Sequence, residues 1–455
     1  MDTVKMDIPS ELIAKYNRPG PRYTSYPTAI HFTEEASPEN LLASTRESTG
    51  PLSLYFHLPF CETLCWFCGC NTIITKDHGR VGDYRKLLER EMDLFGEIIQ
   101  PGRTAHQLHF GGGTPNFFPA DEIARLGESI RNRFSFAEDA ECSVELAPAH
   151  LSEDQVKAFA SFGVKRASFG VQDVDPKVQK AIHRIQPHEM NVRTMDWLRT
   201  NGFQSVNVDL IYGLPGQTVD SFRKTLETVL ALNPDRFAIF NYAHVPWMKP
   251  AQRMLERAGL PTAWEKIEML RLIVSFLTDH GYRYVGMDHF AKPDDELVRA
   301  QEEKSLQRNF QGYSTKAGLE IAAFGISSIS QTDDAYRQNT KDLLSYRRSL
   351  DEGQLPIEKG CEVTRDDRIR RDAIHRMMCD LEIDRSAFNQ AWGIQFDDFF
   401  AGGLAGLQEL ESDGLLEDDG ETVAVTETGR LFLRNIAMCF DADREEKEGR
   451  YSKTV

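Results

Sequence analysis

A chain of 455 residues, 41% of them hydrophobic, can bury a large core and exceeds the size of one typical domain. The net charge of −17 argues against a nucleic-acid partner and an anionic membrane surface, although a local basic pocket could still bind an anionic small molecule. The sequence contains no apolar run long enough to span a bilayer, and its N-terminus lacks the pattern of a secretory signal. We therefore expect a cytoplasmic protein with no membrane partner.

After the first 50 residues, strand patterns alternate with helical patterns. Residues 121–134 place their apolar side chains on one helical face, and residues 152–162 begin with a capping box from Ser152 to Gln155. Strands separated by helices indicate an α/β fold with a parallel sheet, and six such units predict a partial (β/α)6 barrel. The six predicted strands are residues 53–58, 106–110, 142–146, 165–171, 205–211 and 236–240.

Several predicted strands carry polar residues on one face. In residues 205–211, Val206 and Val208 share one face, while Asn207 and Asp209 share the other. A packed barrel interior is mostly branched and apolar, and barrel enzymes place their sites at the carboxyl ends of the strands. The polar faces therefore predict a functional cavity, although a half-solvated sheet face would give the same alternation. The other polar-face residues are Tyr55, His57, Ser143, Glu145, Arg166, Ser168, Gly170 and Gln172.

The pattern changes near residue 345. Residues 345–455 are predicted to be a mainly helical C-terminal domain, with a hairpin within residues 414–430. A helical end with a hairpin can resemble a DNA-binding winged helix. Its acidic loops favour a packing or lid role instead.

Four of the eight cysteines fall within ten residues, at Cys61, Cys65, Cys68 and Cys70. In a reducing compartment such a cluster indicates metal or redox chemistry. A structural zinc site usually needs two separated ligand pairs, and CxxxCxxC has no second pair, so zinc is the less favoured alternative. Three close thiolates suit three irons of a 4Fe–4S cluster, which leaves the fourth iron free to chelate S-adenosylmethionine (SAM). Cys70 follows Cys68 too closely for an obvious ligand role, and its function stays open.

This cysteine motif after a first strand resembles the signature of the radical SAM superfamily, as do GGGTP (111–115) and YGLPGQT (212–218). Over nearly its whole length the chain resembles one family, the oxygen-independent coproporphyrinogen III oxidases. YNRPGPRYTSYPT and the additional cysteine in CGC are typical of that family and are typically absent from the related heme chaperones. Further matching segments are FGVQD (169–173), FNYAHVP (240–246), GMDHFAKPDDEL (286–297), RNFQGYST (308–315), GISSIS (325–330) and MCFD (438–441).

The resemblance implies individual roles for residues of this chain. The 4Fe–4S cluster would be held by Cys61, Cys65 and Cys68. The SAM molecule on the cluster would be contacted by Tyr55, Phe67, Gly112, Gly113, Thr114, Glu145 and Ala243. A second SAM molecule would be contacted by Gln172, Arg184, Asp209 and Ile329, in a pocket lined by Phe310 and Gln311. Asp209 could instead be a satisfied interior carboxylate, Arg184 a surface cation and Phe310 a core residue.

The chain departs from the family pattern at Ala147, Ala149 and His183, where the family usually has aspartate, arginine and asparagine. These departures leave the nearby SAM contacts, and any fine substrate preference, open.

The implied reaction removes two propionate carboxyl groups from coproporphyrinogen III. A 5′-deoxyadenosyl radical takes a hydrogen from the propionate carbon next to the ring, and loss of carbon dioxide and one electron leaves a vinyl group. Two such steps consume two SAM molecules and give protoporphyrinogen IX. An electron donor and an electron acceptor are required, and the sequence identifies neither. The alternatives are another radical SAM tetrapyrrole enzyme, either a methylase or a heme-degrading enzyme, and a heme-trafficking relative.

We expect a monomer with three segments. Residues 1–50 would cover the substrate, residues 51–340 would form the barrel, and residues 345–455 would form the C-terminal domain. Arg18, Arg22 and Arg308 are candidates to receive substrate carboxylates, and each is equally explained as a solvated arginine.

Overall fold

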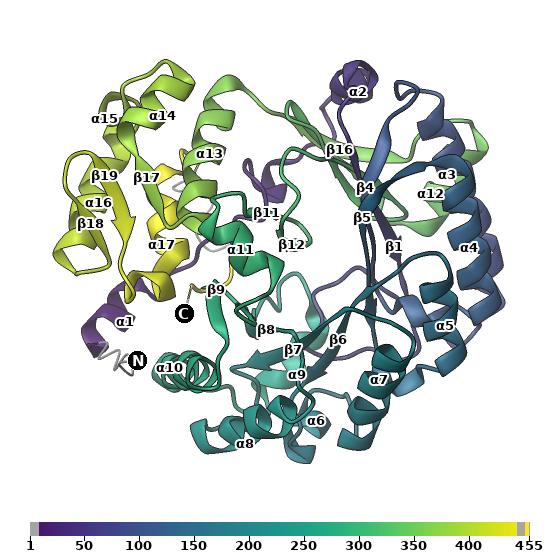
Figure 1. Ribbon diagram of the computed structural model, residues 1–455, viewed down its shortest axis with the longest axis horizontal. Coiled ribbons are helices and arrows are strands. Elements are labelled where there is room, and N and C mark those ends of the chain that lie inside the picture. The colour runs from purple at the N-terminus through teal and green to yellow at the C-terminus, as the bar shows by residue number, and fades with distance from the viewer. Residues whose placement is uncertain (1–8, 444–450, 455) are drawn as a thin grey trace.

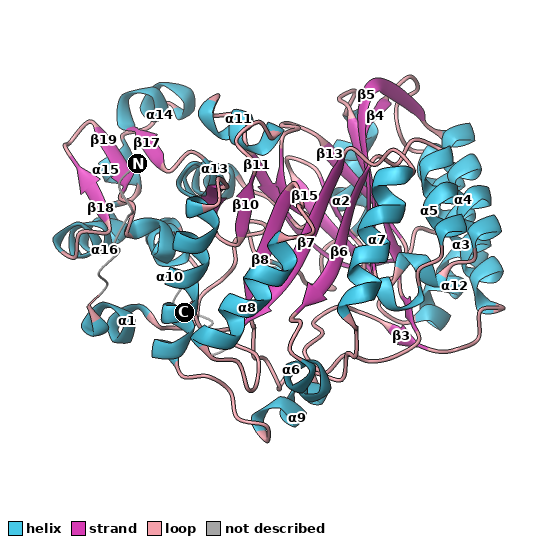
Figure 2. Ribbon diagram, turned by 60° about the horizontal axis from the view of Figure 1, so that its bottom comes forward, coloured by secondary structure: helices cyan, strands magenta, loops and turns pink. Residues whose placement is uncertain are grey.

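The computed structural model describes residues 9–443 and 451–454, and within them twelve strands form one curved sheet (Figures 1 and 2). The sheet strands are β1 (Leu52–Leu58), β4 (Thr104–Gly112), β5 (Ser135–Leu146), β6 (Arg166–Gln172), β7 (Ser205–Tyr212), β8 (Arg236–Asn241), β9 (Arg283–Gly286), β10 (His289–Ala291), β13 (Glu320–Phe324), β14 (Ile329–Gln331), β15 (Ala335–Asn339) and β16 (Ile357–Glu362). Their order is β16-β15-β14-β13-β1-β4-β5-β6-β7-β8-β10-β9. From β13 to β8 in this order, each strand runs parallel to the next one. Towards both edges of the sheet, the pairs β13–β14 and β8–β10 and those beyond them are antiparallel.

The predicted partial barrel is confirmed. The six predicted strands correspond to β1 and β4–β8, and the helices that connect them cover the outer face of the sheet (Figure 1). The Ser152 hydroxyl accepts a hydrogen bond from the Gln155 backbone N–H, so the expected capping box is present. These outer helices are α3 (Arg80–Gly96), α4 (Ala120–Arg133), α5 (Glu153–Ser161), α7 (His188–Thr200) and α8 (Val219–Leu230). The short helix α6 (Pro176–Ala181) lies beside α9 (Arg253–Glu256) beyond the strand ends (Figure 2).

The N-terminal segment bridges the two ends of the sheet. Thr33 pairs with Gly360 of β16. The Tyr336 hydroxyl on β15 donates to the Tyr26 carbonyl at 3.2 Å, and Arg22 binds the Asp288 carboxylate, next to β10, at 3.3 Å. Because the barrel is only partial, this segment helps to close its open side. The remaining elements of the first 352 residues are α1 (Ser10–Tyr16), α2 (Pro38–Glu47), β2 (Phe60–Cys61), β3 (Ile73–Ile74), α10 (Ala263–Asp279), α11 (Glu296–Glu302), β11 (Gln307–Asn309), β12 (Gly312–Ser314) and α12 (Leu343–Asp351).

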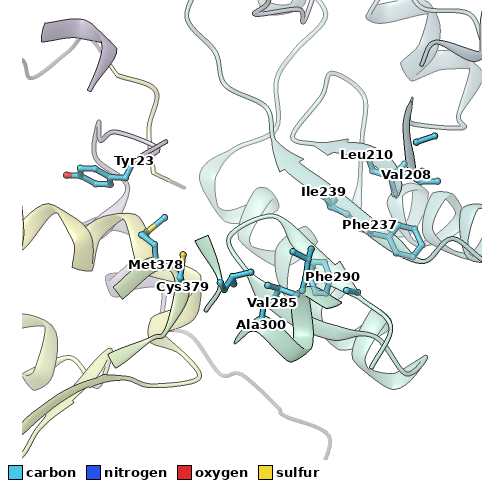
Figure 3. Close-up of a cluster of buried hydrophobic side chains, with 14 of the residues drawn as sticks. Tyr23, Val208, Leu210, Phe237, Ile239, Val285, Phe290, Ala300, Met378 and Cys379 are labelled. Carbon is cyan, nitrogen blue, oxygen red and sulfur yellow. The ribbon is translucent and has the colours of Figure 1, made fainter. Parts of the chain in front are cut away.

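The C-terminal part is mainly helical and contains the predicted hairpin, formed by β18 (Leu416–Asp418) and β19 (Thr422–Val425). A continuous buried core joins it to the barrel. Figure 3 shows side chains of that core from β7 and β8, such as Val208 and Phe237, through Val285 of β9 to Met378. The other elements here are α13 (Arg365–Cys379), β17 (Glu382–Asp384), α14 (Arg385–Trp392), α15 (Phe396–Phe399), α16 (Ala401–Ser412) and α17 (Leu433–Ala437).

The predicted domain limits at 50, 340 and 345 stay predictions. Residues 1–8 of the predicted N-terminal segment, and residues 444–450 and 455 of the predicted C-terminal domain, lie outside the described residues. Among the described helices, none is both long enough and apolar enough to cross a membrane.

Candidate active site

A cavity of about 660 Å³ occupies the barrel interior and reaches the cysteine loop after β1. Glu145 of β5, Gln172 of β6 and Asp209 of β7 line it. Val206 and Val208 of β7 face away from it and are fully buried. The alternation of residue types along these strands therefore separates a polar cavity wall from an apolar outer face. These side chains lie near the carboxyl ends of the strands, where barrel enzymes hold their substrates.

The thiols of Cys61, Cys65 and Cys68 line the same cavity. The Cys61 sulfur lies 3.2 Å from the Thr114 hydroxyl, and Arg184 Nη1 lies 3.7 Å from the Cys65 sulfur. Burial raises the pKa of Cys61 to about 11. The pKa of Cys68 is lowered to about 6, because the Cys70 side chain and backbone N–H both donate to its sulfur.

The three thiols lie on one loop at the wall of one cavity. A 4Fe–4S cluster binds each thiolate through a different iron, which suits three cysteines at this close spacing. The thiols together with this donor-lined cavity therefore suit a 4Fe–4S cluster with SAM bound beside it.

The glycine turn after β4 packs tightly against the chain that leads into the cysteine loop. Gly112 has a φ of +110°, and a Cβ atom there would lie 2.7 Å from the His57 ring. A Cβ at Gly113 would lie 2.5 Å from the Pro59 carbonyl oxygen. The Gly113 N–H donates to the Leu58 carbonyl at 2.8 Å. Glycine is therefore needed so that this turn can lie beside the thiols.

Glu145 is a carboxylate held in its charged form. Burial opposes its ionisation, but hydrogen bonds from His109, at 3.3 Å, and from the Gly112 N–H, at 3.4 Å, outweigh that effect and lower its pKa. Its side chain remains 48% exposed to the cavity. Glu145 can thus accept further hydrogen bonds from a ligand.

Asp209 differs from Glu145 because its direct partners are neutral. The Ser168 hydroxyl lies 2.9 Å from the Asp209 carboxylate, and the Asn207 amide donates to it at 2.7 Å. Burial raises the pKa of Asp209 to about 7, and the negative charge of Glu145 adds to that rise. A cavity carboxylate in this environment would be stabilised by a cationic ligand group such as an ammonium.

Several polar atoms of the cavity have no protein partner. Gln172 Oε1, Asn207 Oδ1 and Gln311 Nε2 are buried and lack a hydrogen-bond partner among the described residues. All three residues line the cavity. Arg184 is already engaged, because its Nη2 donates to the Gly170 carbonyl at 2.8 Å. Buried polar atoms usually find partners, so this pattern fits a polar ligand of SAM's size and chemistry.

The structure gathers most of the predicted site residues around this cavity. Its lining includes Cys61, Cys65, Phe67, Cys68, Gly112, Gly113, Thr114, Glu145, Gln172, Arg184, Asp209 and Gln311. Four predicted residues lie outside that lining. Tyr55 stacks on the cavity residue His109 with 5.9 Å between ring centroids. The Ala243 carbonyl accepts a hydrogen bond from Gln252 at 3.3 Å, and Phe310 and Ile329 pack against a small apolar cluster around Tyr336. The ligand roles of all these residues stay predictions.

The three departures from the family pattern also lie at the cavity wall. The backbone of Ala147 exchanges two hydrogen bonds with the side chain of Asn116, at 2.8 and 3.1 Å. The His183 ring hydrogen-bonds to the Leu64 carbonyl at 2.9 Å and stacks on Trp66. His183 therefore helps to position the cysteine loop, while Ala147 and Ala149 offer no charged side chain to a ligand.

His109 lies in the site but was not predicted from the sequence as a site residue. It bridges Ser143, at 2.7 Å, and Glu145, at 3.3 Å, across the cavity wall. The alternation within β4 could have revealed it, because His109 shares the cavity-facing side of that strand with Gln107. His289 also lines the cavity, and it lies on a short strand without a comparable signal.

Comparisons with known proteins agree with this geometry. Residues 55–229 match the family model of the radical SAM superfamily, and residues 363–432 match that of the HemN C-terminal domain. The oxygen-independent coproporphyrinogen III oxidase of Synechocystis is 43% identical over 99% of this chain and 98% of its own length. That of Escherichia coli is also 43% identical, over 98% of each chain.

The solved structure of coproporphyrinogen III oxidase (HemN) from E. coli, a radical SAM enzyme, matches with a TM-score of 0.91 and 42% identity. The match covers 96% of this chain and 99% of the E. coli chain. Sequence and structure thus agree over both the barrel and the C-terminal part. The chain belongs to the family of oxygen-independent coproporphyrinogen III oxidases within the radical SAM superfamily.

Proposed function

We propose that this protein catalyses the oxygen-independent oxidative decarboxylation of two propionate side chains of coproporphyrinogen III, which gives protoporphyrinogen IX. The observation that carries the proposal is the presence of the three loop thiols and the polar strand faces in one cavity. When bound, the 4Fe–4S cluster and SAM supply a 5′-deoxyadenosyl radical. The protein must position the substrate against this radical and keep competing groups away.

The cavity residues divide this task by their chemistry. Cys61, Cys65 and Cys68 would hold the cluster through their thiolates. Glu145, whose carboxylate is charged, would accept hydrogen bonds from a SAM bound at the cluster. Asp209 would receive a cationic group of a second SAM molecule. Two SAM molecules per product follow from the two propionates, because each one loses its own hydrogen atom.

The overall balance requires two electron-transfer partners. Each propionate loses one hydrogen atom, one molecule of carbon dioxide and one electron as the vinyl group forms. An electron acceptor must take that electron, and a donor must reduce the cluster before each SAM cleavage. We further propose a monomeric, cytoplasmic enzyme with no nucleic-acid or membrane partner. A methylase, a heme-degrading enzyme and a heme-trafficking protein are not favoured, because the full-length relatives carry the oxidase name.

Anaerobic product analysis tests this function. The reconstituted protein, given SAM, a reductant, an electron acceptor and coproporphyrinogen III, should form protoporphyrinogen IX with two carbon dioxide molecules and about two 5′-deoxyadenosines per product. Mass spectrometry of the porphyrins and chromatography of the nucleosides measure both quantities. A methylated tetrapyrrole, or SAM cleavage without carbon dioxide release, would instead indicate one of the other radical enzymes.

A further inference from the structure

A second cavity, of about 820 Å³, lies between the barrel and the C-terminal helices. Its walls come from residues 23–26 of the N-terminal segment, residues 307–309 of the β11–β12 hairpin and one face of α13. Tyr336, Ile374, Met378 and Trp392 contribute apolar surface. The charged lining residues are Arg308, Lys316, Arg368 and Arg371, and Glu47, Glu320, Asp333, Asp334 and Asp372. Four of these five carboxylates, all except Glu47, pair with an arginine. None of the predicted cofactor-site residues lines this cavity.

Among the described residues, Arg308 is the arginine of this cavity that forms no ion pair with a carboxylate. Its Nε and Nη1 atoms are buried and have no hydrogen-bond partner among the described residues. Its guanidinium lies over the Tyr313 ring, 5.0 Å from the centroid. Arg368, in contrast, binds Asp334 at 2.8 Å, and Arg371 lies 3.7 Å from Asp333. A partly buried guanidinium without a counter-charge is stabilised when an anion binds to it.

The structure distinguishes between the three arginines that were predicted as candidate carboxylate receptors. Arg22 is already paired with Asp288 at 3.3 Å. Arg18 lies over the Tyr16 ring and lines neither large cavity. Arg18 and Arg22 each also have a buried Nε without a hydrogen-bond partner among the described residues, but of the three only Arg308 lines a large cavity.

The β11–β12 hairpin lies between this cavity and the cysteine cavity and contributes residues to the lining of both. Arg308 of β11 is directly opposite Tyr313 of β12. Arg308 lines the second cavity, while Tyr313 and Gln311 line the cysteine cavity. Coproporphyrinogen III has one propionate on each of its four rings, so one carboxylate can bind at Arg308 while another reaches toward the cysteine cavity.

We propose that Arg308 binds a propionate carboxylate of the tetrapyrrole that the reaction leaves intact, with the second cavity holding that side of the molecule. This inference rests on the proposed function. Arginine stabilises the anionic carboxylate through a planar pair of hydrogen bonds. A propionate that leaves as neutral carbon dioxide would be held back by that pairing, so Arg308 suits a retained propionate. The aromatic and apolar walls suit the pyrrole rings.

Binding of coproporphyrin III, the stable oxidised form of the substrate, provides a test that does not depend on turnover. Fluorescence titration of the anaerobic full-length protein measures its affinity. Arg308→Gln should weaken binding at least about tenfold, because a buried charge-assisted pair is lost. Arg308→Lys should bind with an affinity between those of the wild type and Arg308→Gln, since lysine keeps the charge but lacks the planar guanidinium. Arg90→Gln, which removes an arginine paired with Asp351 outside both cavities, should bind like the wild type.

Coproporphyrin III with all carboxylates methylated gives a second comparison. It should bind the wild type and Arg308→Gln equally weakly, because neither can form the ion pair. Equal affinity of the wild type and Arg308→Gln for the free acid would overturn the proposal, as would an equal loss in Arg90→Gln. If Arg308→Gln does not fold, as judged by thermal melting, the lysine variant and the methylated ligand decide the question.

The binding experiment and the product assay together distinguish failure of the Arg308 proposal from failure of the proposed function. Unchanged affinity in Arg308→Gln, together with normal conversion by the wild type, removes the Arg308 site and leaves the function in place. Arg308-dependent porphyrin binding without conversion by the reconstituted wild type supports the site and contradicts the function.

Discussion

Cys65→Ala is expected to abolish the 4Fe–4S cluster and to reduce SAM cleavage and decarboxylation to background. The cluster needs three thiolate ligands, and the variant keeps only two of them. The fold should survive, because Cys65 lies in a partly exposed loop and the barrel core is formed by other residues. Iron and sulfide analysis of the anaerobically reconstituted protein, with its absorption spectrum, measures the cluster, and circular dichroism measures the fold.

A matched control exists on β16. Cys361→Ala removes a cysteine that lies outside the cysteine cavity, so the cluster and the activity should both be retained. A normal cluster content in Cys65→Ala would show that the ligand assignment is wrong.

Asp209→Asn is expected to reduce kcat/KM about 100-fold while cluster content stays unchanged. Asparagine keeps the shape of the side chain but removes the charge that would pair with a cationic SAM group. The cysteine ligands remain in place, so iron binding should not change. Activity at a temperature where the variant is folded, divided by iron content, measures the effect. Near-wild-type activity in that state would remove Asp209 from the site.

The stability difference between the cofactor-free wild type and Asp209→Asn should change with pH in a defined direction. Burial raises the folded-state pKa of Asp209 from 3.8 to about 7. The folded state therefore binds this proton more tightly than the unfolded state, and the wild type loses stability as pH rises through that interval. Asparagine does not ionise, so the variant should gain stability relative to the wild type over the same interval and keep that gain above it. Denaturant unfolding of both proteins at several pH values between 4 and 8 tests this prediction. A difference in unfolding free energy that does not change with pH would contradict it.

Glu91 of α3 provides a matched buried carboxylate outside the cavity. Burial raises its pKa to about 7 as well, and it accepts hydrogen bonds from Tyr346, Asn339 and the Gly325 N–H. Glu91→Gln should lower thermal stability through these lost contacts and leave the activity per folded molecule nearly unchanged. The contrast between the two variants separates a ligand-binding carboxylate from a structural one.

The strands β1 and β4–β8 could be predicted because each has six residues or more and most are followed by amphipathic helices. The parallel strand β13 was not predicted, because its five residues are all buried and show no alternation. The strands β14 and β10 have three residues each, too few for a periodic pattern to emerge. Their place in the sheet depends on pairing with distant segments. The bridging path of the N-terminal segment likewise depends on tertiary contacts, such as that of Arg22 with Asp288.

The site was predictable in part for the same reason. Alternation along β5 and β7 placed Glu145 and Asp209 on cavity-facing sides, and local spacing indicated the thiols. Local sequence could not show that Tyr55 would stack on His109 outside the cavity lining, or that Phe310 would pack against Tyr336. It also could not distinguish Arg308 from Arg22, because that difference lies in which arginine meets a carboxylate in space.

Deuterium transfer tests the central claim most directly. Coproporphyrinogen III deuterated on the propionate carbons next to the rings, incubated anaerobically with reconstituted protein, SAM, a reductant and an electron acceptor, should give 5′-deoxyadenosine that is one mass unit heavier. The product should be protoporphyrinogen IX that has lost one deuterium from each of two propionates. Undeuterated 5′-deoxyadenosine formed alongside protoporphyrinogen IX would contradict hydrogen abstraction from these carbons, and with it the proposed reaction.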